Sequence, residues 1–434
     1  MDGIIIEGGQ PLIGDIYISG SKNASLPIMA ACLLADGIVK LRNVPVLSDI
    51  STMQQLLENH GCEIEQILHE NDFGNDSLTL KIESNKVKNF IAPYDIVRKM
   101  LSSIWLLGPL LAKFGKAQVS HPGGCAIGAR LINLHIAVLE AMGAEITIKE
   151  GYVTANSKNA SPSGKLIGCN FTFEKISVGA TITGILAAVL AEGETNLSNC
   201  AIEPEIVDLC NFLNKMGANI EFSGTNIKIK GVTSLKAISY KIIPDRIEAG
   251  TYIMACAMTK GKVNIKGIDK SFLANVIPIF KQTGMIITDK EDSIEVSCHN
   301  DIKATNMTTA EYPGFPTDLQ AQFMAMMTLA GGRSTVTEII FENRFMHVPE
   351  LCRMGAHINI EGNTAIVEGV KSLSGAEVMA SDLRASVSLI MAGLAAKGLT
   401  KVKRVYHLDR GYQRLERKLQ ACGAKIVRTI LDVV

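Results

Sequence analysis

Hydrophobic positions along the chain recur in a pattern that ends, six times, in a helix followed by a glycine. Apolar residues at helical spacing precede Gly61, Gly143, Gly217, Gly284, Gly355 and Gly423, and polar and apolar residues alternate after each one. Alternation is the period of a half-buried strand, and a glycine just past a helix commonly adopts the left-handed conformation that ends it. The pattern therefore predicts six helix–glycine–strand endings, spaced 67 to 82 residues apart.

A second series of endings interleaves with the first. Alanine- and leucine-rich helical stretches end at Gly37, Gly115, Gly193, Gly261, Gly332 and Gly398, and each is followed by a strand pattern. Chance recurrence of a common ending is a poor explanation for two interleaved series. We therefore predict six copies of one unit, each longer than the usual solenoid repeat.

The predicted fold class is α/β, with two domains of three units each and a cleft between them. Proline interrupts the pattern in the stretch 241–246, after the third copy. A chain of 434 residues is also longer than one ordinary core supports. Ligand sites are common at such domain interfaces, so we expect the substrate there.

Composition narrows the class of partner. Lysine plus arginine and aspartate plus glutamate number 43 each, which leaves no overall field to attract nucleic acid or a membrane surface. The ten cysteines form no C-x-x-C pair, so a zinc site or a thioredoxin-like motif has no support. With no basic stretch followed by an apolar run at residues 1–4, we expect a cytoplasmic protein without a secretory signal or membrane span.

One cysteine stands apart from the others. Cys125 lies in a segment with three glycines and a proline, between His121 and Arg130. Glycine gives a side chain little to pack against, and neighbouring positive charge favours the thiolate. A buried structural cysteine is the ordinary alternative, but this setting favours a reactive thiol.

Four other segments place charged or polar side chains at expected helix starts. They contain Lys22 and Asn23; Lys175 with Ser177, Val178 and Gly179; Asp318; and Arg384 with Arg410. Each has a structural alternative: Asp318 and Asp382 as helix N-caps, the cations as solvated surface. Together with Cys125 they predict a cleft with several cations, one carboxylate and one thiol, which suits a substrate bearing phosphate and carboxylate groups.

Several enzyme classes are excluded by missing motifs. The sequence contains no G-x-S-x-G elbow, which argues against a serine hydrolase of the α/β class. A Walker loop and a G-x-G-x-x-G after a strand are also missing, so an ATPase or a nicotinamide enzyme is not expected. Trp105 has apolar neighbours and is expected in the core.

Several longer motifs carry a specific resemblance. The stretches 122–125 and 127–130, 177–181, 203–208, 244–248, 312–322, 341–350 and 409–412 resemble the UDP-N-acetylglucosamine 1-carboxyvinyltransferase family of enolpyruvyl transferases. The resemblance covers essentially the whole chain. It implies a two-domain inside-out α/β barrel with six repeated units, made of an N-terminal domain, 22–243, and a C-terminal domain, 1–21 plus 244–434.

The resemblance also implies a reaction and roles. The family joins the 3′-hydroxyl of UDP-N-acetylglucosamine to C2 of phosphoenolpyruvate, releases phosphate, and so opens peptidoglycan synthesis. Cys125 would donate a proton to C3, Asp318 would accept the hydroxyl proton, and Lys22, Arg130 and Arg410 would hold phosphate and carboxylate, with Arg384 beside them. The substrate-binding positions implied are Asn23, Leu131, Ile132, Asn133, Leu134, Lys175, Ser177, Val178, Gly179 and Ile340. No metal or organic cofactor, nucleic acid or membrane is implied, and a monomer is expected.

The chain departs from the family at three positions. Leu101 stands where the family usually has arginine, Leu131 replaces a proline and Asn133 an aspartate; Arg98, one helical turn before Leu101, is a candidate to compensate. Two other functions stay open: the sister transferase acting on shikimate 3-phosphate, and a nucleotide-sugar-binding relative that has lost turnover. The cysteine loop and the 177–179 element argue against the first, and Leu101 motivates the second.

Overall fold

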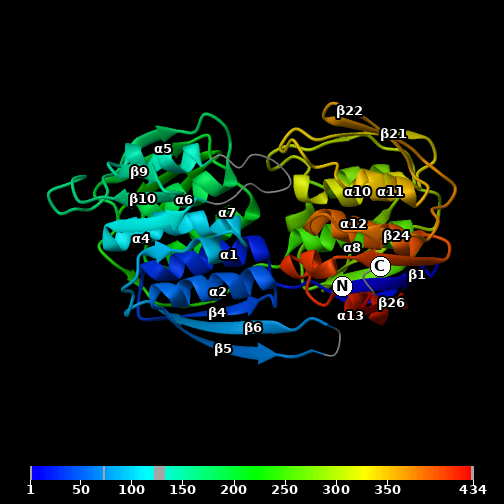
Figure 1. Ribbon diagram of the computed structural model, residues 1–434, viewed down its shortest axis with the longest axis horizontal. Helices are drawn as coiled ribbons and strands as arrows, with labels where there is room; N and C mark the ends of the chain where they lie inside the picture. Colours follow the sequence, from blue (N-terminus) through cyan, green and yellow to red (C-terminus); the bar gives the residue numbers. More distant parts are fainter. Residues whose placement is uncertain (1, 72–73, 122–131, 432–434) are drawn as a thin grey trace.

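The computed structural model describes residues 2–71, 74–121 and 132–431. Their buried apolar side chains form two separate cores, one spanning residues 24–242 and the other residues 4–18 with 247–426. We call the parts built on them the N-terminal and C-terminal domains; they lie left and right in Figure 1. The predicted two-domain α/β architecture is confirmed at this level.

The sheets of both domains share one strand order. Within the described residues there are six four-stranded sheets, and in each a parallel pair is followed by two antiparallel neighbours. In the N-terminal domain these sheets are β16 (Ser239–Lys241), β4 (Ile38–Val44), β6 (Ser77–Glu83), β5 (Glu63–His69); β7 (Ile91–Ala92), β8 (Lys116–Ser120), β10 (Tyr152–Asn156), β9 (Glu145–Lys149); and β11 (Asn170–Thr172), β12 (Glu194–Ser198), β14 (Asn226–Lys230), β13 (Asn219–Ser223). A short parallel pair joins β15 (Leu235–Lys236) to β3 (Ala35–Asp36).

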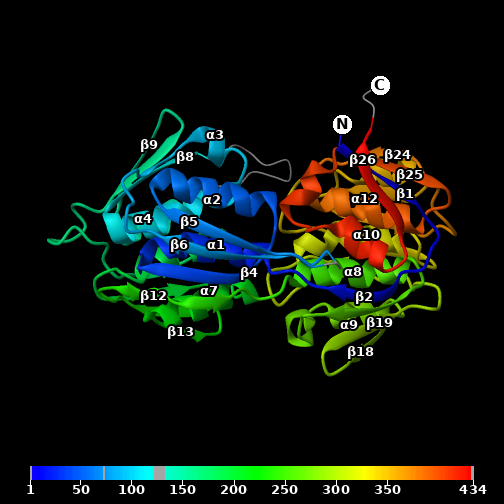
Figure 2. The same cartoon turned by 90° about the horizontal axis from the view of Figure 1, so that it is seen from below.

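The C-terminal domain takes in the start of the chain. Its sheets are β2 (Ile13–Tyr17), β17 (Lys262–Lys266), β19 (Ser293–Ser297), β18 (Ile286–Asp289); β20 (Met307–Thr308), β21 (Arg333–Thr337), β23 (Thr364–Glu368), β22 (His357–Glu361); and β24 (Glu377–Met379), β25 (Leu399–Lys403), β1 (Asp2–Glu7), β26 (Lys425–Ile430). Strands β1 and β2 thus pair with strands more than 240 residues further along. Both chain ends consequently lie in this domain (Figures 1 and 2).

Helices pack inside the sheets. The N-terminal domain contains α1 (Lys22–Ala31), η1 (Cys32–Leu34), α2 (Ser48–His60), α3 (Tyr94–Val97), η2 (Leu101–Leu106), α4 (Leu107–Phe114), α5 (Asn133–Ala141), α6 (Val178–Ala188) and α7 (Pro204–Met216). The C-terminal domain contains α8 (Arg246–Met258), η3 (Lys270–Leu273), α9 (Ile277–Gln282), η4 (Thr317–Leu319), α10 (Gln320–Met327), α11 (Val348–Arg353), α12 (Leu383–Ala395), η5 (Val405–Arg410) and α13 (Leu415–Ala421). Helices α8 and α10 are buried along their whole length, including the charged side chains of Arg246 and Glu248 in α8.

The predicted glycine endings are found where the pattern placed them. All six glycines of the first series have φ between +89° and +107°, so each supplies the left-handed turn that a side chain with Cβ adopts at a cost. In the second series Gly261 differs, because the left-handed residue there is Lys260. A Cβ at Gly261 would lie 2.2 Å from the backbone oxygen of Leu12, so this glycine permits a close backbone approach instead.

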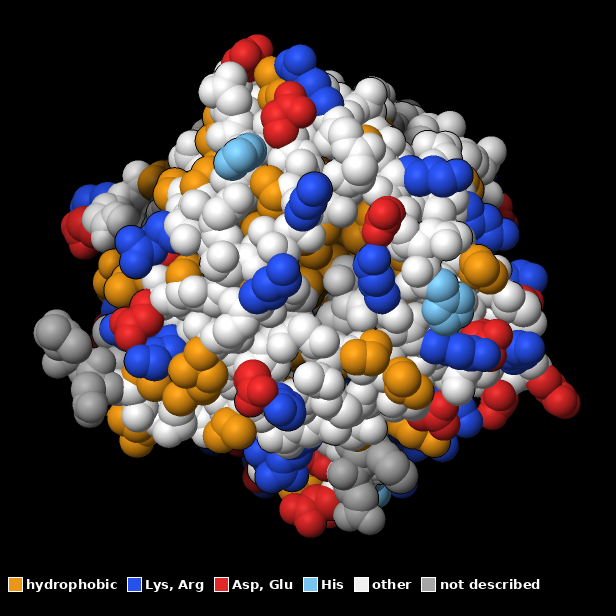
Figure 3. Space-filling model, turned by 90° about the vertical axis from the view of Figure 1, so that its right-hand side faces the viewer, with side chains coloured by type: hydrophobic (Ala, Val, Ile, Leu, Met, Phe, Trp, Pro, Cys, Tyr) orange, Lys and Arg blue, Asp and Glu red, His pale blue; other side chains and the backbone are white. Residues whose placement is uncertain are grey.

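The surface carries no strong single-sign field in the view of Figure 3. On this end of the molecule lysine and arginine side chains lie among acidic ones and scattered apolar ones, in keeping with the equal charge counts. None of the helices in the described part of the chain combines the length and the apolar character that a membrane span requires.

Candidate active site

Asp318 is held between two arginines. It lies in η4, and its Oδ1 accepts a hydrogen bond from Nη2 of Arg344 at 2.9 Å while Oδ2 accepts one from Nη2 of Arg384 at 2.7 Å. Burial acts to raise the pKa of Asp318, but Arg384 and Arg344, with Lys22, outweigh it and hold that pKa well below 3.8. The carboxylate is therefore ionised at neutral pH.

A buried polar network fixes Arg384. This arginine follows the N-cap of α12, and its Nη1 donates to the Tyr412 hydroxyl at 3.1 Å. The same hydroxyl lies 2.8 Å from Oγ1 of Thr251 and accepts from Nε2 of Gln322 at 3.1 Å. Burial is the largest single influence on the pKa of Arg384 and lowers it, but the charge and hydrogen bond of Asp318, together with Tyr412 and Asp245, outweigh burial and raise that pKa. The guanidinium stays charged and has little freedom to turn.

A second carboxylate joins cations from both domains. Lys22 is the first residue of α1, whose N-cap is Ser21, and its Nζ lies 3.4 Å from Oδ2 of Asp49 in α2. Arg410, at the end of η5 in the other domain, donates from Nε to Oδ1 of Asp49 at 2.9 Å. Burial lowers the pKa of Lys22, and the Asp49 charge counteracts this.

These two groups form one cluster with an excess of positive charge. Lys22 is influenced electrostatically by Asp49, Arg384, Asp318 and Arg410, so all five lie near one another where the domains meet. Among the described residues, the cluster with Arg344 contains four cations and two carboxylates. The surplus of positive charge favours binding of a multiply charged anion. Arginine binds phosphate or carboxylate through paired hydrogen bonds.

Other predicted residues form a second group around α5 and α6. Ser177 is the N-cap of α6 and accepts from the backbone nitrogen of Ala180 at 3.3 Å; Val178 and Gly179 open the helix. A Cβ at Gly179 would lie 3.1 Å from the His135 ring and 3.3 Å from Nε1 of Trp105. The backbone of Gly179 therefore lies directly against these two rings.

The remaining predicted residues are placed as follows. At the start of α5, Ile132 and Leu134 are buried and Asn133 is exposed; Asn23 and Ile340 are half-buried, and Lys175 is exposed. Leu101 is half-buried in η2, while Arg98 is about half exposed and pairs with Asp95 at 3.5 Å. Cys125, Arg130 and Leu131 lie outside the described residues.

Of the two aspartates that the sequence also allowed as helix N-caps, one is a cap and the other is not. Asp382 is an N-cap, accepting from the backbone nitrogens of Arg384 and Ala385 at 2.9 and 3.1 Å. For Asp318 the cap interpretation is wrong: Pro316 holds the position before η4, and the carboxylate faces arginines. Trp105 packs half-buried against the core, as expected, and its ring lies beside the backbone of Gly179.

Sequence reasoning missed two residues of the charged cluster, Asp49 and Arg344, and Tyr412, whose hydroxyl accepts from Arg384. Asp49 reads as an ordinary acidic residue in the first turn of a helix, Arg344 as one of several polar loop residues, and Tyr412 as a neighbour of Arg410. The available signal was their occurrence inside or beside polar segments that break the repeat. Their partners lie up to 361 residues away.

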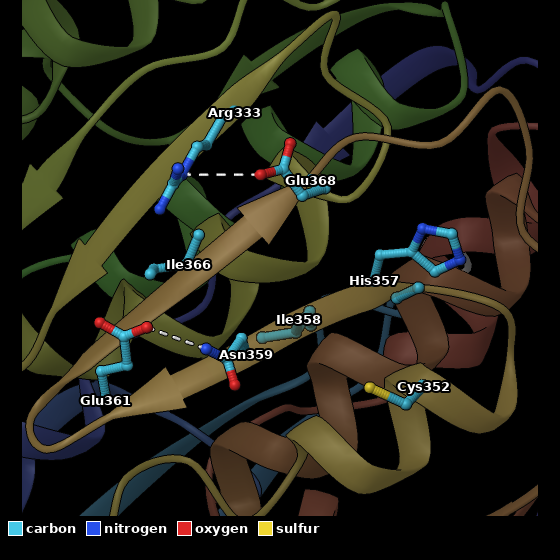
Figure 4. A pocket seen from close by; sticks show the side chains of 9 residues that line it. Arg333, Cys352, His357, Ile358, Asn359, Glu361, Ile366 and Glu368 are labelled. Carbon is cyan, nitrogen blue, oxygen red and sulfur yellow. Dashed lines mark hydrogen bonds and ion pairs between the residues drawn. The ribbon is translucent and has the colours of Figure 1, made fainter.

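A surface hollow on the outer sheet of the C-terminal domain is separate from this cluster. It is lined by side chains of β21, β22 and β23 with Cys352, and an ion pair joins Arg333 to Glu368 across it (Figure 4). None of the predicted site residues lines it.

Comparison with known proteins identifies the class. The profile of the EPSP synthase (3-phosphoshikimate 1-carboxyvinyltransferase) family matches residues 6–419, and the chain belongs to this family. Within it, proteins of Rickettsia bellii and Rickettsia canadensis that are 58% identical over 99% of this chain and 100% of their own are named UDP-N-acetylglucosamine 1-carboxyvinyltransferase. The predictions of this family and of a transferase enzyme are confirmed.

Solved structures agree on the fold. The enolpyruvyl transferase NikO of Streptomyces tendae superimposes with a TM-score of 0.85 at 24% identity, over 99% of both chains. An EPSP synthase of Acinetobacter baumannii gives a TM-score of 0.76 at 18% identity, over 99% of this chain and 100% of its own.

Proposed function

We propose that this protein transfers the enolpyruvyl group of phosphoenolpyruvate to the 3′-hydroxyl of UDP-N-acetylglucosamine and releases phosphate. The observation that carries the proposal is the cluster of four cations around two carboxylates at the domain junction. Its chemistry suits the phosphate and carboxylate of phosphoenolpyruvate. The 58% identity to the rickettsial proteins of that name supports the nucleotide-sugar acceptor.

The proposed reaction is an addition followed by an elimination. A proton from Cys125 adds to C3 of phosphoenolpyruvate while the hydroxyl oxygen forms a bond to C2 and Asp318 takes the hydroxyl proton. The tetrahedral adduct then loses phosphate from C2, to which Asp318 passes the hydroxyl proton. Asp318 next accepts a proton from C3, which restores the double bond, and Cys125 regains its proton from solvent. Lys22, Arg130 and Arg410 stabilise the charges, with Arg384 beside them.

The setting of Asp318 imposes a condition on this role. A carboxylate held by two guanidinium groups is ionised but weakly basic, since its pKa lies well below 3.8. An efficient base has a pKa closer to the working pH. An anionic substrate bound beside Arg384 and Arg344 would offset their positive charge at Asp318 and raise the basicity of Asp318. The base would thus become effective when the substrate is bound.

The nucleotide sugar is assigned to the second group of residues. The start of α6, with Ser177, Val178 and Gly179, would meet the diphosphate or sugar through backbone nitrogens, and residues 131–134, Lys175, Asn23 and Ile340 would line the remainder. Because this chain has Leu101 where the family usually has arginine, one charged contact with the substrate would be missing. This reaction would commit the sugar nucleotide to peptidoglycan synthesis.

The architecture proposed with this function is two inside-out barrels of three units each. Residues 22–243 would form one domain and residues 1–21 with 244–434 the other. The common strand order of the six sheets and the division of the two cores support this.

Phosphate release from phosphoenolpyruvate tests the function. With UDP-N-acetylglucosamine as acceptor we expect turnover, and with shikimate 3-phosphate none; Asp318→Asn should lower kcat by two orders of magnitude or more, roughly the contribution of a general base. Release with shikimate 3-phosphate alone would identify the sister transferase. No release with either acceptor at millimolar concentration would identify a binding protein without turnover.

A further inference from the structure

Asp49 occupies an unusual place in the charged cluster. It lies in the first turn of α2 with its side chain 6% exposed. Its Oδ1 accepts from Nε of Arg410 at 2.9 Å, and its Oδ2 lies 3.4 Å from both Nη2 of Arg410 and Nζ of Lys22. One carboxylate thus contacts a cation from each domain, and both cations are ones assigned to the substrate anion.

Joining the domains does not by itself explain Asp49. A second pair crosses the same junction: Oδ2 of Asp76 lies 3.5 Å from Nε of Arg414, four residues beyond Arg410. In both pairs the aspartate is 6% exposed and the arginine considerably more so, so the two pairs are alike in burial and in the domains they join. Asp49 differs from Asp76 in contacting Lys22 as well.

We infer that Asp49 is a positioning residue for the anion site: it orients the Arg410 guanidinium by one edge and keeps the Lys22 ammonium charged, so that both meet phosphoenolpyruvate together. This inference rests on the proposed function. Bidentate contact along the Nε edge fixes the plane of a guanidinium. A buried ammonium, in turn, needs a nearby negative charge to stay protonated.

The groups that face Lys22 determine the sign of the effect. Asp49 and Asp318 favour the charged ammonium, whereas burial, Arg384 and Arg410 oppose it; Asp245 accepts from its backbone nitrogen at 3.3 Å. Neutralising Asp49 removes one of the two favourable charges. The pKa of Lys22 then falls, and the alkaline limb of the rate profile moves to lower pH.

The test compares Asp49→Asn with Asp76→Asn, a matched change at the other junction pair. We expect Asp49→Asn to raise KM for phosphoenolpyruvate on the order of ten- to a hundredfold, as for loss of a charge-assisted hydrogen bond. KM for UDP-N-acetylglucosamine should stay within about twofold, because the substitution weakens the binding of phosphoenolpyruvate alone. The alkaline limb of kcat/KM for phosphoenolpyruvate should move to lower pH, and Asp49→Glu should restore part of the loss.

Asp76→Asn should leave both KM values and the alkaline limb as in the wild type. Equal effects of the two substitutions, or an unmoved alkaline limb in Asp49→Asn, would overturn the inference and reduce Asp49 to a structural tie. Thermal unfolding of each variant verifies that it folds. An inactive wild type would instead contradict the proposed function, so the two failures are distinguishable.

Discussion

Single thiols in this chain have very different surroundings, and these predict which one reacts. Burial raises the pKa of Cys62, Cys200 and Cys256 to about 12, so almost none of each is the reactive thiolate at pH 7. Cys352 is exposed, and Cys125 is the proposed proton donor. We expect an epoxide phosphonate, which mimics the substrate anion, to alkylate Cys125 alone, as measured by peptide mass spectrometry.

Iodoacetamide provides the control for that experiment. It lacks the phosphonate, so it should label the exposed Cys352 as well as Cys125. Labelling of Cys352 by the epoxide phosphonate at a comparable rate would show that exposure, and not an anion site, determines the reaction.

Arg344 is predicted to control the acid limb of activity. Its positive charge, 2.9 Å from Asp318, favours the ionised carboxylate, so removing it raises the pKa of Asp318. In Arg344→Gln the acid limb of kcat/KM should therefore move to higher pH, as measured in a constant-ionic-strength buffer from below pH 3.8 up to pH 8.

Arg333→Gln is a suitable control for Arg344→Gln. Arg333 also pairs with a carboxylate, but it lies in the outer hollow of Figure 4 with its side chain largely exposed. Its removal should leave the acid limb in place. A shift of the same size in both variants would mean that Asp318 is not the group that titrates.

The role of a single residue could be predicted from the sequence when its partners lie within a few residues of it along the chain. The cap at Asp382 uses backbone nitrogens two and three residues away, and the start of α1 at Lys22 follows from the preceding Ser21. Asp49 and Arg344 could not be found in this way. Their significance arises from partners brought close only by the folded chain, such as Arg410, 361 residues from Asp49.

Elements of secondary structure were predictable wherever glycine marked their ends. The six left-handed glycines appear after the six predicted helices because that backbone conformation carries a penalty for other residues. Partners of the strands were not predictable. The parallel pairing of β16 with β4, for example, joins Ser239 to Lys40, and nothing in a short strand specifies so distant a partner.

The β5–β6 hairpin is an element whose outer end contacts the other domain. It extends from the N-terminal domain toward the C-terminal domain (Figure 1), where the buried Gln413 donates to the backbone oxygens of Gly74 and Asp76 and accepts from the backbone nitrogen of Val46. Gln413→Ala leaves these backbone groups without partners, which costs about 1–3 kcal/mol per buried group. We expect a lower urea midpoint and faster amide exchange in residues 74–80.

Gln420→Ala provides the comparison for the hairpin. Gln420 donates to the backbone oxygen of Ile426 within the same domain, so its removal should not affect exchange in the hairpin. Unchanged exchange at residues 74–80 in Gln413→Ala would show that the hairpin holds its position by other contacts.

At the scale of the whole molecule, charge is balanced overall and unbalanced locally. The 43 basic and 43 acidic residues cancel, whereas the junction gathers four cations around two carboxylates among its described residues. Lys22 comes from one domain, and Arg344, Arg384 and Arg410 come from the other. An anion bound there contacts both domains, and its binding energy is available to hold them together.

Both domains also bury a histidine in its neutral form, and this predicts how acid weakens the molecule. Burial lowers the pKa of His135 in the N-terminal domain and of His347 in the C-terminal domain to about 4. An unfolded histidine has a pKa near 6.5, so below that pH the unfolded state binds more protons. The stabilisation is complete above pH 6.5 and falls by about 1.4 kcal/mol per pH unit for each histidine as pH drops toward 4. Urea unfolding between pH 7 and 5 should show a smaller loss in His135→Gln and in His347→Gln than in the wild type, by about that slope each. An unchanged pH dependence in both variants would exclude the buried pair as its source.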